Sequence, residues 1–218
     1  MSLHLQRDLD KLKKEILKLG NLVETAINNA ILSLNNREVS YVEEVFHQED
    51  LINEMEVKIE EDCLKILALH QPVAGDLRFI VVALKVNNDL ERMGDFAKNI
   101  SKRARELMQE DPFPTLPEFV NDLPDLVRTM VRKSLDALVK LDIDQAREVI
   151  EMDDKVDKIN RDMHAIVKRE IARNPARAET AINLLSCSRY MERIADLSTN
   201  IAEDVIFMVE GKVIRHAD

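Results

Sequence analysis

The sequence has few of the residues that form tight turns and β-sheet cores. Its 218 residues include four glycines, six prolines and no tryptophan, and only 4% are aromatic. So few aromatic side chains argue against β-sandwiches and barrels, and against the stacking surfaces on which proteins bind bases. The two cysteines, Cys63 and Cys187, lack the spacing of a metal site. We expect buried, reduced thiols, as in a reducing cytoplasm.

Long apolar runs are also missing. The longest, Phe79 to Leu84, is far too short to span a bilayer, so no membrane insertion is expected. The first residues do not combine a basic region with an apolar one, so no signal peptide is expected. We therefore predict a cytoplasmic protein.

The charge is strongly acidic. Lysine and arginine number 31 against 41 aspartates and glutamates, which leaves a net charge of −10. A field of this sign repels phosphate backbones, so we expect no nucleic-acid partner, and it favours cations and basic protein surfaces. Hydrophobic residues make up 45% and charged residues 33%, a mixture typical of amphipathic helices around a core.

Apolar residues recur with the helical period along most of the chain and predict an all-α fold. The expected helices cover residues 5–35, 38–69, 73–109, 119–141, 143–173 and 175–210. Short turns at Asn35-Asn36 and Leu141-Asp142 imply that the helices they join are antiparallel neighbours. No segment alternates with a period of two, so we expect no strands.

Prolines divide the chain near its middle. Four of the six lie within residues 111–124, a stretch that a continuous helix cannot cross. We therefore predict a first three-helix bundle over 1–110, a proline-rich connection over 111–124 and a second three-helix bundle over 125–218. Pro72 and Pro175 occupy equivalent places in the two halves, and each is expected in the first turn of a helix.

The two halves are an internal repeat. A shift of 101 residues aligns Leu90-Glu-Arg-Met-Gly-Asp-Phe-Ala-Lys-Asn-Ile100 with Met191-Glu-Arg-Ile-Ala-Asp-Leu-Ser-Thr-Asn-Ile201. A shift of 104 residues pairs Glu49-Asp50 with Asp153-Asp154. Two tandem three-helix units explain both alignments.

Acidic pairs recur at corresponding places of this repeat. Glu91 with Asp95, and Glu192 with Asp196, are each separated by one helical turn and therefore share a helix face. Like charges at this spacing repel each other unless a cation or a basic side chain lies between them. One such pair means little in a chain with 41 acidic residues, but each pair recurs and continues to an asparagine one turn later. In the first half, a helical wheel places Glu91, Asp95 and Asn99 roughly opposite the apolar seam of the same helix, which includes Val86 and Leu90, so they face outward.

The second helix of each half carries a related polar stripe. Its members are Glu49, Asn53, Glu56 and Glu60 in the first half and Asp153, Asp157, Asn160 and His164 in the second. Carboxylates with amide or imidazole support, and without thiolates, suit Mg²⁺, Mn²⁺, iron or Zn²⁺. The alternative is a salt-bridged surface, because Arg92, Arg193 and Lys98 are nearby.

Signals of an enzyme are poor. A ferritin-like di-iron centre needs Glu-x-x-His on two helices, and that pattern occurs once, as Glu44-Val-Phe-His47. The sequence has no glycine-rich phosphate loop and no nucleophile elbow. We therefore expect no enzyme, no catalytic residue and no organic cofactor.

Several segments together resemble the PhoU family of phosphate-transport regulatory proteins. They are Gln71-Pro-Val-Ala-Gly-Asp-Leu-Arg-Phe-Ile80, Asp89-Leu-Glu-Arg-Met-Gly-Asp95 and Tyr190-Met-Glu-Arg-Ile-Ala-Asp196. The likeness covers nearly the whole chain. It implies two three-helix bundles related by pseudo-symmetry.

The resemblance also implies a metal. The family's Glu/Asp-x-x-x-Asp motifs hold metal clusters, with iron and zinc among the metals. They correspond here to Glu91, Asp95, Glu192 and Asp196, with support from Glu49, Asn53, Asp153 and Asp157. Because Asn53 is an amide where the second half has the carboxylate of Asp157, the two sites are expected to differ.

The role that the resemblance implies is regulatory. Members restrain phosphate-starvation signalling when phosphate is plentiful, by linking the phosphate ABC transporter to a sensor histidine kinase. The family includes dimers, so a homodimer is a further expectation. The competing hypotheses are an accessory protein of another phosphate or metal-ion transporter, and a metal-dependent enzyme or metal store built on a helical bundle.

Overall fold

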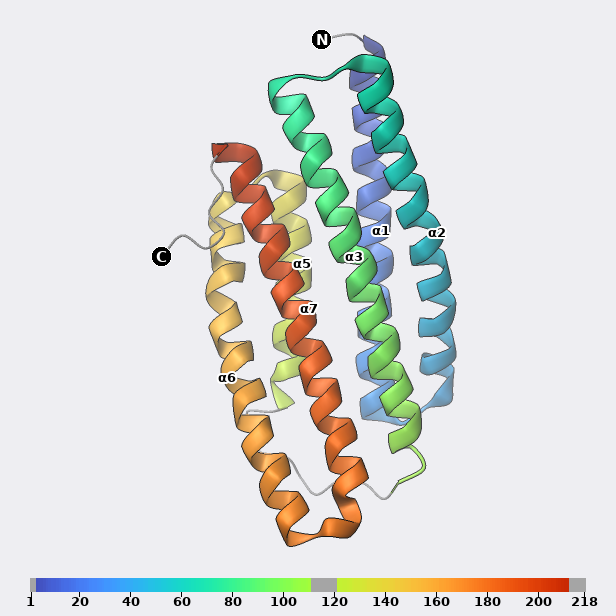
Figure 1. The fold of residues 1–218 in the computed structure, drawn as a ribbon, viewed down its shortest axis with the longest axis vertical. Coiled ribbons are helices and arrows are strands. Elements are labelled where there is room, and N and C mark those ends of the chain that lie inside the picture. The colour runs from blue at the N-terminus through green and yellow to red at the C-terminus, as the bar shows by residue number, and fades with distance from the viewer. Residues whose placement is uncertain (1–2, 111–120, 212–218) are drawn as a thin grey trace.

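The computed structural model describes residues 3–110 and 121–211, which form helices and turns without any strand. The helices are α1 Leu3–Asn36, α2 Val39–His70, α3 Ala74–Leu107, α5 Leu123–Lys140, α6 Ile143–Arg173 and α7 Ala178–Glu210, with a 3-10 turn, η1, at Pro175–Arg177. Two three-helix bundles lie side by side, α1 to α3 in one and α5 to α7 in the other (Figure 1). Within the described ranges, none of the helices is both long and apolar enough to cross a membrane. The all-α prediction is confirmed.

The helix ends agree with the sequence-based ranges except near the prolines. Pro175 opens η1, which leads directly into α7. Pro72 was expected inside a first helical turn, and this is wrong, because α3 begins at Ala74. The residue before a proline is driven away from the right-handed helical region. Gln71 ends α2 in a left-handed conformation (φ 46°), in which its N–H donates to the Leu67 carbonyl, and Pro72 follows in the turn.

The connection predicted for 111–124 lies mostly outside the described residues, which resume at 121. Its last two residues belong to α5, which begins at Leu123 rather than at 119. Pro124 stands in the first turn of α5, where its missing N–H leaves no helical hydrogen bond unmade.

The central helices α3 and α7 pack against each other and join the two bundles. Their apolar seams are buried, at Val82, Val86, Leu90, Met93, Ala97 and Ile100 in α3 and at Met191, Ile194, Ser198, Ile201 and Val205 in α7. With these seams turned inward, the acidic pairs of the same helices face the grooves that α3 forms with α2 and that α7 forms with α6.

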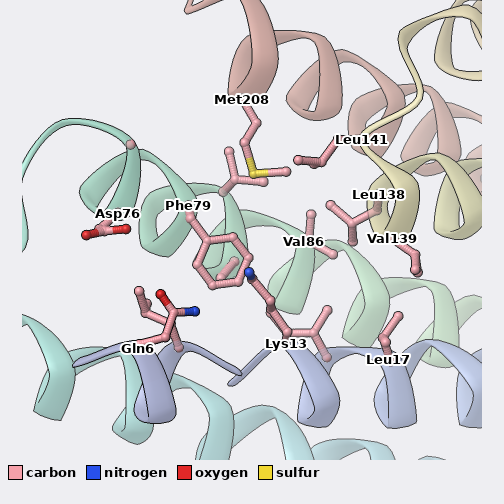
Figure 2. A pocket seen from close by; sticks show the side chains of 15 residues that line it. Gln6, Lys13, Leu17, Asp76, Phe79, Val86, Leu138, Val139, Leu141 and Met208 are labelled. Carbon is pink, nitrogen blue, oxygen red and sulfur yellow. The ribbon is translucent and has the colours of Figure 1, made fainter. Parts of the chain in front are cut away.

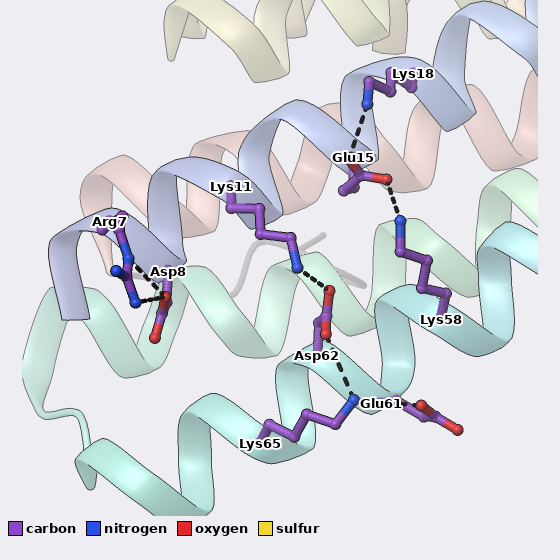
Figure 3. A network of polar contacts seen from close by, with 9 residues as sticks. All are labelled: Arg7, Asp8, Lys11, Glu15, Lys18, Lys58, Glu61, Asp62 and Lys65. Carbon is purple, nitrogen blue, oxygen red and sulfur yellow. Dashed lines mark hydrogen bonds and ion pairs between the residues drawn. The ribbon is translucent and has the colours of Figure 1, made fainter. Parts of the chain in front are cut away.

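Polar contacts hold α2 against α1 on the outside of the first bundle (Figure 3). Lys11 Nζ lies 3.2 Å from Asp62 Oδ2, and Lys58 Nζ lies 2.9 Å from Glu15 Oε2. A second lysine, Lys18, reaches the other oxygen of Glu15 at 2.9 Å. These contacts supplement the apolar packing that sets the distance between α1 and α2.

Candidate metal centre

Four carboxylates converge where α6 and α7 pack together, and we call them the second-half cluster: Asp153 and Asp157 of α6, with Glu192 and Asp196 of α7. Each helix contributes two acids one turn apart, so both members of a pair face the neighbouring helix. Oxygens of Asp153, Asp157 and Asp196 all lie within 4.8 Å of one another. The sequence predicted the two pairs, and the helix packing brings three of these four carboxylates within reach of one ion.

The electrostatics of this cluster disfavour four ionised carboxylates without a cation. Burial, followed by the charges of Asp196, Asp157 and Glu192, raises the pKa of Asp153 to about 6. Burial and a neighbouring carboxylate also raise the pKa of Glu192 and of Asp196. Within the described part of the chain, no lysine or arginine lies within 4 Å of Asp153, Glu192 or Asp196. Only Asp157 has such a partner, Arg161 at 3.1 Å.

Two oxygens of the second-half cluster are buried without a hydrogen-bond partner, Oδ1 of Asp153 and Oε2 of Glu192. Buried polar atoms are almost always paired, because an unpaired one loses its water without compensation. A cation bound between the carboxylates would satisfy both oxygens and offset the repulsion. The donor set, all oxygen and without thiolate, fits a hard or borderline metal ion.

A hollow of about 370 Å³ opens beside this cluster. Asp153 and Asp196 line it together with Arg193, Thr199 and Asn200 of the second bundle, and α3 contributes Arg92 and Phe96. The hollow therefore lies at the junction of the two bundles and leaves space for further ligands of a bound ion. Phe96 is held there by stacking on Tyr190, with 6.0 Å between the ring centroids.

The equivalent residues of the first bundle form the first-half cluster: Glu49 and Asn53 of α2, with Glu91 and Asp95 of α3. Unlike the second-half cluster, this cluster contains a lysine that pairs with one of its acids, because Lys98 Nζ lies 2.6 Å from Glu49 Oε2. Asn53 Nδ2 donates to the other oxygen of Glu49 at 3.1 Å. Although burial would raise the pKa of Glu49, Lys98 and Asn53 outweigh it and hold that pKa below its ordinary value.

The other acids of the first-half cluster resemble those of the second. Burial, then the charges of Asp95 and Glu56, raises the pKa of Glu91. Burial and Glu49 raise the pKa of Asp95. No three His, Cys, Asp or Glu residues of the described range 3–110 offer ligand atoms within 4.8 Å of one another.

Sequence reasoning gave Lys98 no place in the first-half cluster and treated it only as a nearby base. The repeat held a usable signal, because the shift of 101 residues aligns Lys98 with the uncharged Thr199. Glu56, one of the acids that raise the pKa of Glu91, was on the predicted stripe of α2 but was not assigned to a site.

A separate apolar pocket of about 470 Å³ lies between α1, α3, α5 and α7 (Figure 2). Phe79, Val86, Leu138 and Met208 form much of its wall, and Lys13 Nζ lies 5.3 Å from the centre of the Phe79 ring. Its single acid, Asp76, stands at one end. The pocket therefore lacks the converging donors that a metal needs.

Comparison with known proteins decides the family. The family model described as "PhoU domain" matches residues 16–104 and again residues 120–205. The chain belongs to the PhoU family. A relative from Aquifex aeolicus (strain VF5), named "Phosphate-specific transport system accessory protein PhoU homolog", is 36% identical over 96% of this chain and 95% of its own length.

Two PhoU crystal structures share the fold. That of PhoU from Pseudomonas aeruginosa superposes with a TM-score of 0.92 at 34% identity, covering 95% of this chain and 99% of the other. That of the phosphate transport system regulatory protein PhoU from Streptococcus pneumoniae gives 0.83 at 26% identity, covering 96% and 98%. The two matches to the PhoU domain, one in each half, confirm the predicted repeat.

Proposed function

We propose that this protein is a cytoplasmic, metal-binding regulator of phosphate uptake and of phosphate-starvation signalling, which restrains the response when phosphate is plentiful. The names of its relatives, accessory and regulatory proteins of phosphate transport, support the phosphate role. Its proposed partners are components of the phosphate ABC transporter and a sensor histidine kinase. The net charge of −10 favours docking on basic surfaces of these partners.

The observation that carries the metal is the second-half cluster with its two buried oxygens that lack partners. Iron or zinc is the proposed ion, alone or as a multinuclear cluster. Asp153, Asp157, Glu192 and Asp196 would hold it. The ion would bridge α6 to α7, so that metal binding stabilises the second bundle.

We further propose that the protein does not catalyse a reaction. The names of the relatives, accessory and regulatory proteins of phosphate transport, support this proposal. Metal-loaded protein should therefore show no turnover of phosphoesters or peroxide, and measurable turnover would favour the competing metal-enzyme hypothesis.

Metal content tests the binding step. Protein stripped with a chelator is dialysed against iron, zinc, manganese or magnesium, and the bound metal is measured by mass spectrometry. We expect at least one ion per chain in the wild type and none in Glu192→Gln/Asp196→Asn. The matched control, Glu151→Gln/Glu179→Gln, removes two exposed acids from the same helices and should bind as the wild type does. Equal, near-zero binding in the wild type and both variants would contradict metal binding.

A deletion strain tests the regulatory step. Loss of the gene should derepress phosphate-starvation genes at high phosphate, and the wild-type gene should restore repression. Starvation genes that stay silent in the deletion strain would contradict the proposal. Complementation by Glu192→Gln/Asp196→Asn then asks whether repression needs the metal. Light scattering of the purified protein tests the predicted homodimer.

A further inference from the structure

We propose that the ammonium group of Lys98 serves as the permanent cation of the first-half cluster, so that this chain binds metal in its second half alone. The inference deepens the proposed function and rests on metal binding by the second-half cluster. It replaces the expectation, drawn from the family resemblance, that both halves hold a metal.

The first argument is the position of the ammonium group. Lys98 Nζ lies 2.6 Å from Glu49 Oε2 and 5.7 Å from the centre of the Phe46 ring. Its side chain is 26% exposed, whereas that of Glu49 is 6% exposed. The ammonium group therefore lies within the groove between α2 and α3, between a buried carboxylate and an aromatic face.

The second argument is that both oxygens of Glu49 already accept a hydrogen bond. Lys98 binds one oxygen, and the Asn53 amide donates to the other at 3.1 Å. A metal ion that approached Glu49 would meet the positive charge of Lys98 and would compete with both donors. Removing one partner of a buried charge pair is costly, since the carboxylate is then desolvated without compensation. The remaining acids, Glu91 and Asp95 with Glu56 near Glu91, form no group of three within 4.8 Å in the described residues.

The third argument is the contrast between the halves. The repeat replaces Lys98 by Thr199, whose hydroxyl donates to the backbone oxygen of Ala195 at 3.3 Å. It also replaces Asn53 by Asp157. The first-half cluster thus has three carboxylates and one ammonium group, and the second-half cluster has four carboxylates and no bound base but Arg161. Buried acid oxygens without partners occur only in the second of these clusters, within the described residues.

The two halves of the repeat therefore obtain positive charge from different sources. A lysine ammonium is a compact point charge that the chain carries at all times. The first bundle therefore keeps one positive charge in its acidic groove whatever the metal supply. The second bundle depends on an ion from solution and is the half whose stability follows metal availability.

The test grafts the second-half residues onto the first half. In the background Glu192→Gln/Asp196→Asn, whose second-half cluster is disabled, we expect no bound manganese, zinc or iron. Adding Lys98→Thr and Asn53→Asp should restore about one ion per chain, as expected when the built-in cation is exchanged for a ligand. Adding Glu91→Gln should abolish that ion again. Lys65→Thr, which removes an exposed lysine of α2 that pairs with Glu61 and Asp62, is the matched control and should restore nothing.

Two outcomes would overturn the inference. One is a metal ion in the background protein that Glu91→Gln removes, because the first half would then bind metal beside Lys98. The other is a folded Lys98→Thr/Asn53→Asp variant of that background that gains no metal. Circular dichroism checks folding in each case. The second-half cluster is disabled in all of these variants, so their metal content tests only the inference about Lys98. Absence of metal from the wild-type protein would instead contradict the proposed function.

If the Lys98→Thr/Asn53→Asp variant does not fold, the reciprocal exchange in the second-half cluster tests the inference. Thr199→Lys alone, made in the otherwise wild-type chain so that every proposed metal ligand remains, should give a folded protein that has lost its second-half metal. The hollow beside Thr199 leaves room for the longer side chain. If this variant keeps its metal, a lysine at this position does not displace the ion and the inference is wrong.

Discussion

Lys85 of α3 and Asp204 of α7 form an ion pair between the two bundles, with 2.9 Å between Nζ and Oδ1. The carboxylate side chain is 3% exposed, and the lysine also lies 5.5 Å from the centre of the Phe207 ring. The pair lies in the same α3–α7 contact that positions Arg92 and Phe96 beside the second-half cluster. It therefore helps to fix how the first bundle meets the groove between α6 and α7 of the second.

Replacing Lys85 by Met should destabilise the protein, because the change leaves the charge of Asp204 buried without its lysine. We expect a loss of about 2 kcal/mol in the free energy of unfolding, below the usual range for buried pairs since Lys85 is 41% exposed. Urea unfolding measures it. Lys65→Met, which removes a lysine from an exposed pair, should change the free energy by about 0.5 kcal/mol or less. Equal effects of the two variants would contradict this assignment.

The Glu15 network predicts a loss of stability in acid. Lys58 and then Lys18 lower the pKa of Glu15 from 4.5 to about 2. Between these values the unfolded state binds more protons than the folded one. The stabilisation is therefore complete above pH 4.5 and disappears as the pH falls toward 2. Glu15→Gln should cost about 1 kcal/mol at pH 7 and nothing near pH 2.

Urea unfolding at several pH values between 2 and 7 follows this difference. Glu61→Gln provides the control, because Glu61 belongs to an exposed pair with Lys65 in the same region (Figure 3). The control should differ from the wild type by about 0.5 kcal/mol or less at each pH. A Glu15→Gln penalty that persists unchanged at pH 2 would show that packing, rather than charge, accounts for it.

The repeat predicts a compensating pair in the core. A Cβ on Gly94 would lie 2.9 Å from Cδ1 of Ile52, and the second half has Ala195 and the smaller Val156 at these places. Gly94→Ala should therefore be better tolerated together with Ile52→Val. We expect a favourable coupling of about 1 kcal/mol in a double-mutant cycle of unfolding free energies.

Gly75 is the control position for that cycle. It lies on the same helix, and nothing stands within 4 Å of a Cβ placed there. The coupling between Gly75→Ala and Ile52→Val should be near zero, since the two sites share no contact. Equal coupling in the two cycles would rule out the steric explanation.

Both cysteines should be inert in the folded protein. Burial raises the pKa of the Cys63 and Cys187 thiols to about 12, so little reactive thiolate forms near neutral pH. We expect no reaction with a disulfide reagent such as DTNB at pH 8, and reaction of two thiols per chain in guanidinium. Prompt reaction of a thiol in the native protein would contradict the burial of that residue.

Much of this molecule followed from the sequence, because helical periodicity acts locally. The apolar period gave the helices, the prolines placed the breaks, and the repeat gave the two bundles. The spacing of Glu91 from Asp95, and of Glu192 from Asp196, also determined that each pair shares a face. None of these statements requires knowledge of which helix lies opposite.

Tertiary structure decided which side chains meet in the two acidic clusters. Lys98 and Glu49 are 49 residues apart in the chain, and their contact depends on the register of α3 against α2. The same kind of packing buries Glu192 Oε2 and leaves it without a partner. Sequence spacing fixes which face of a helix a side chain occupies. The charges near that side chain, and its exposure to water, are determined only when another helix packs against that face.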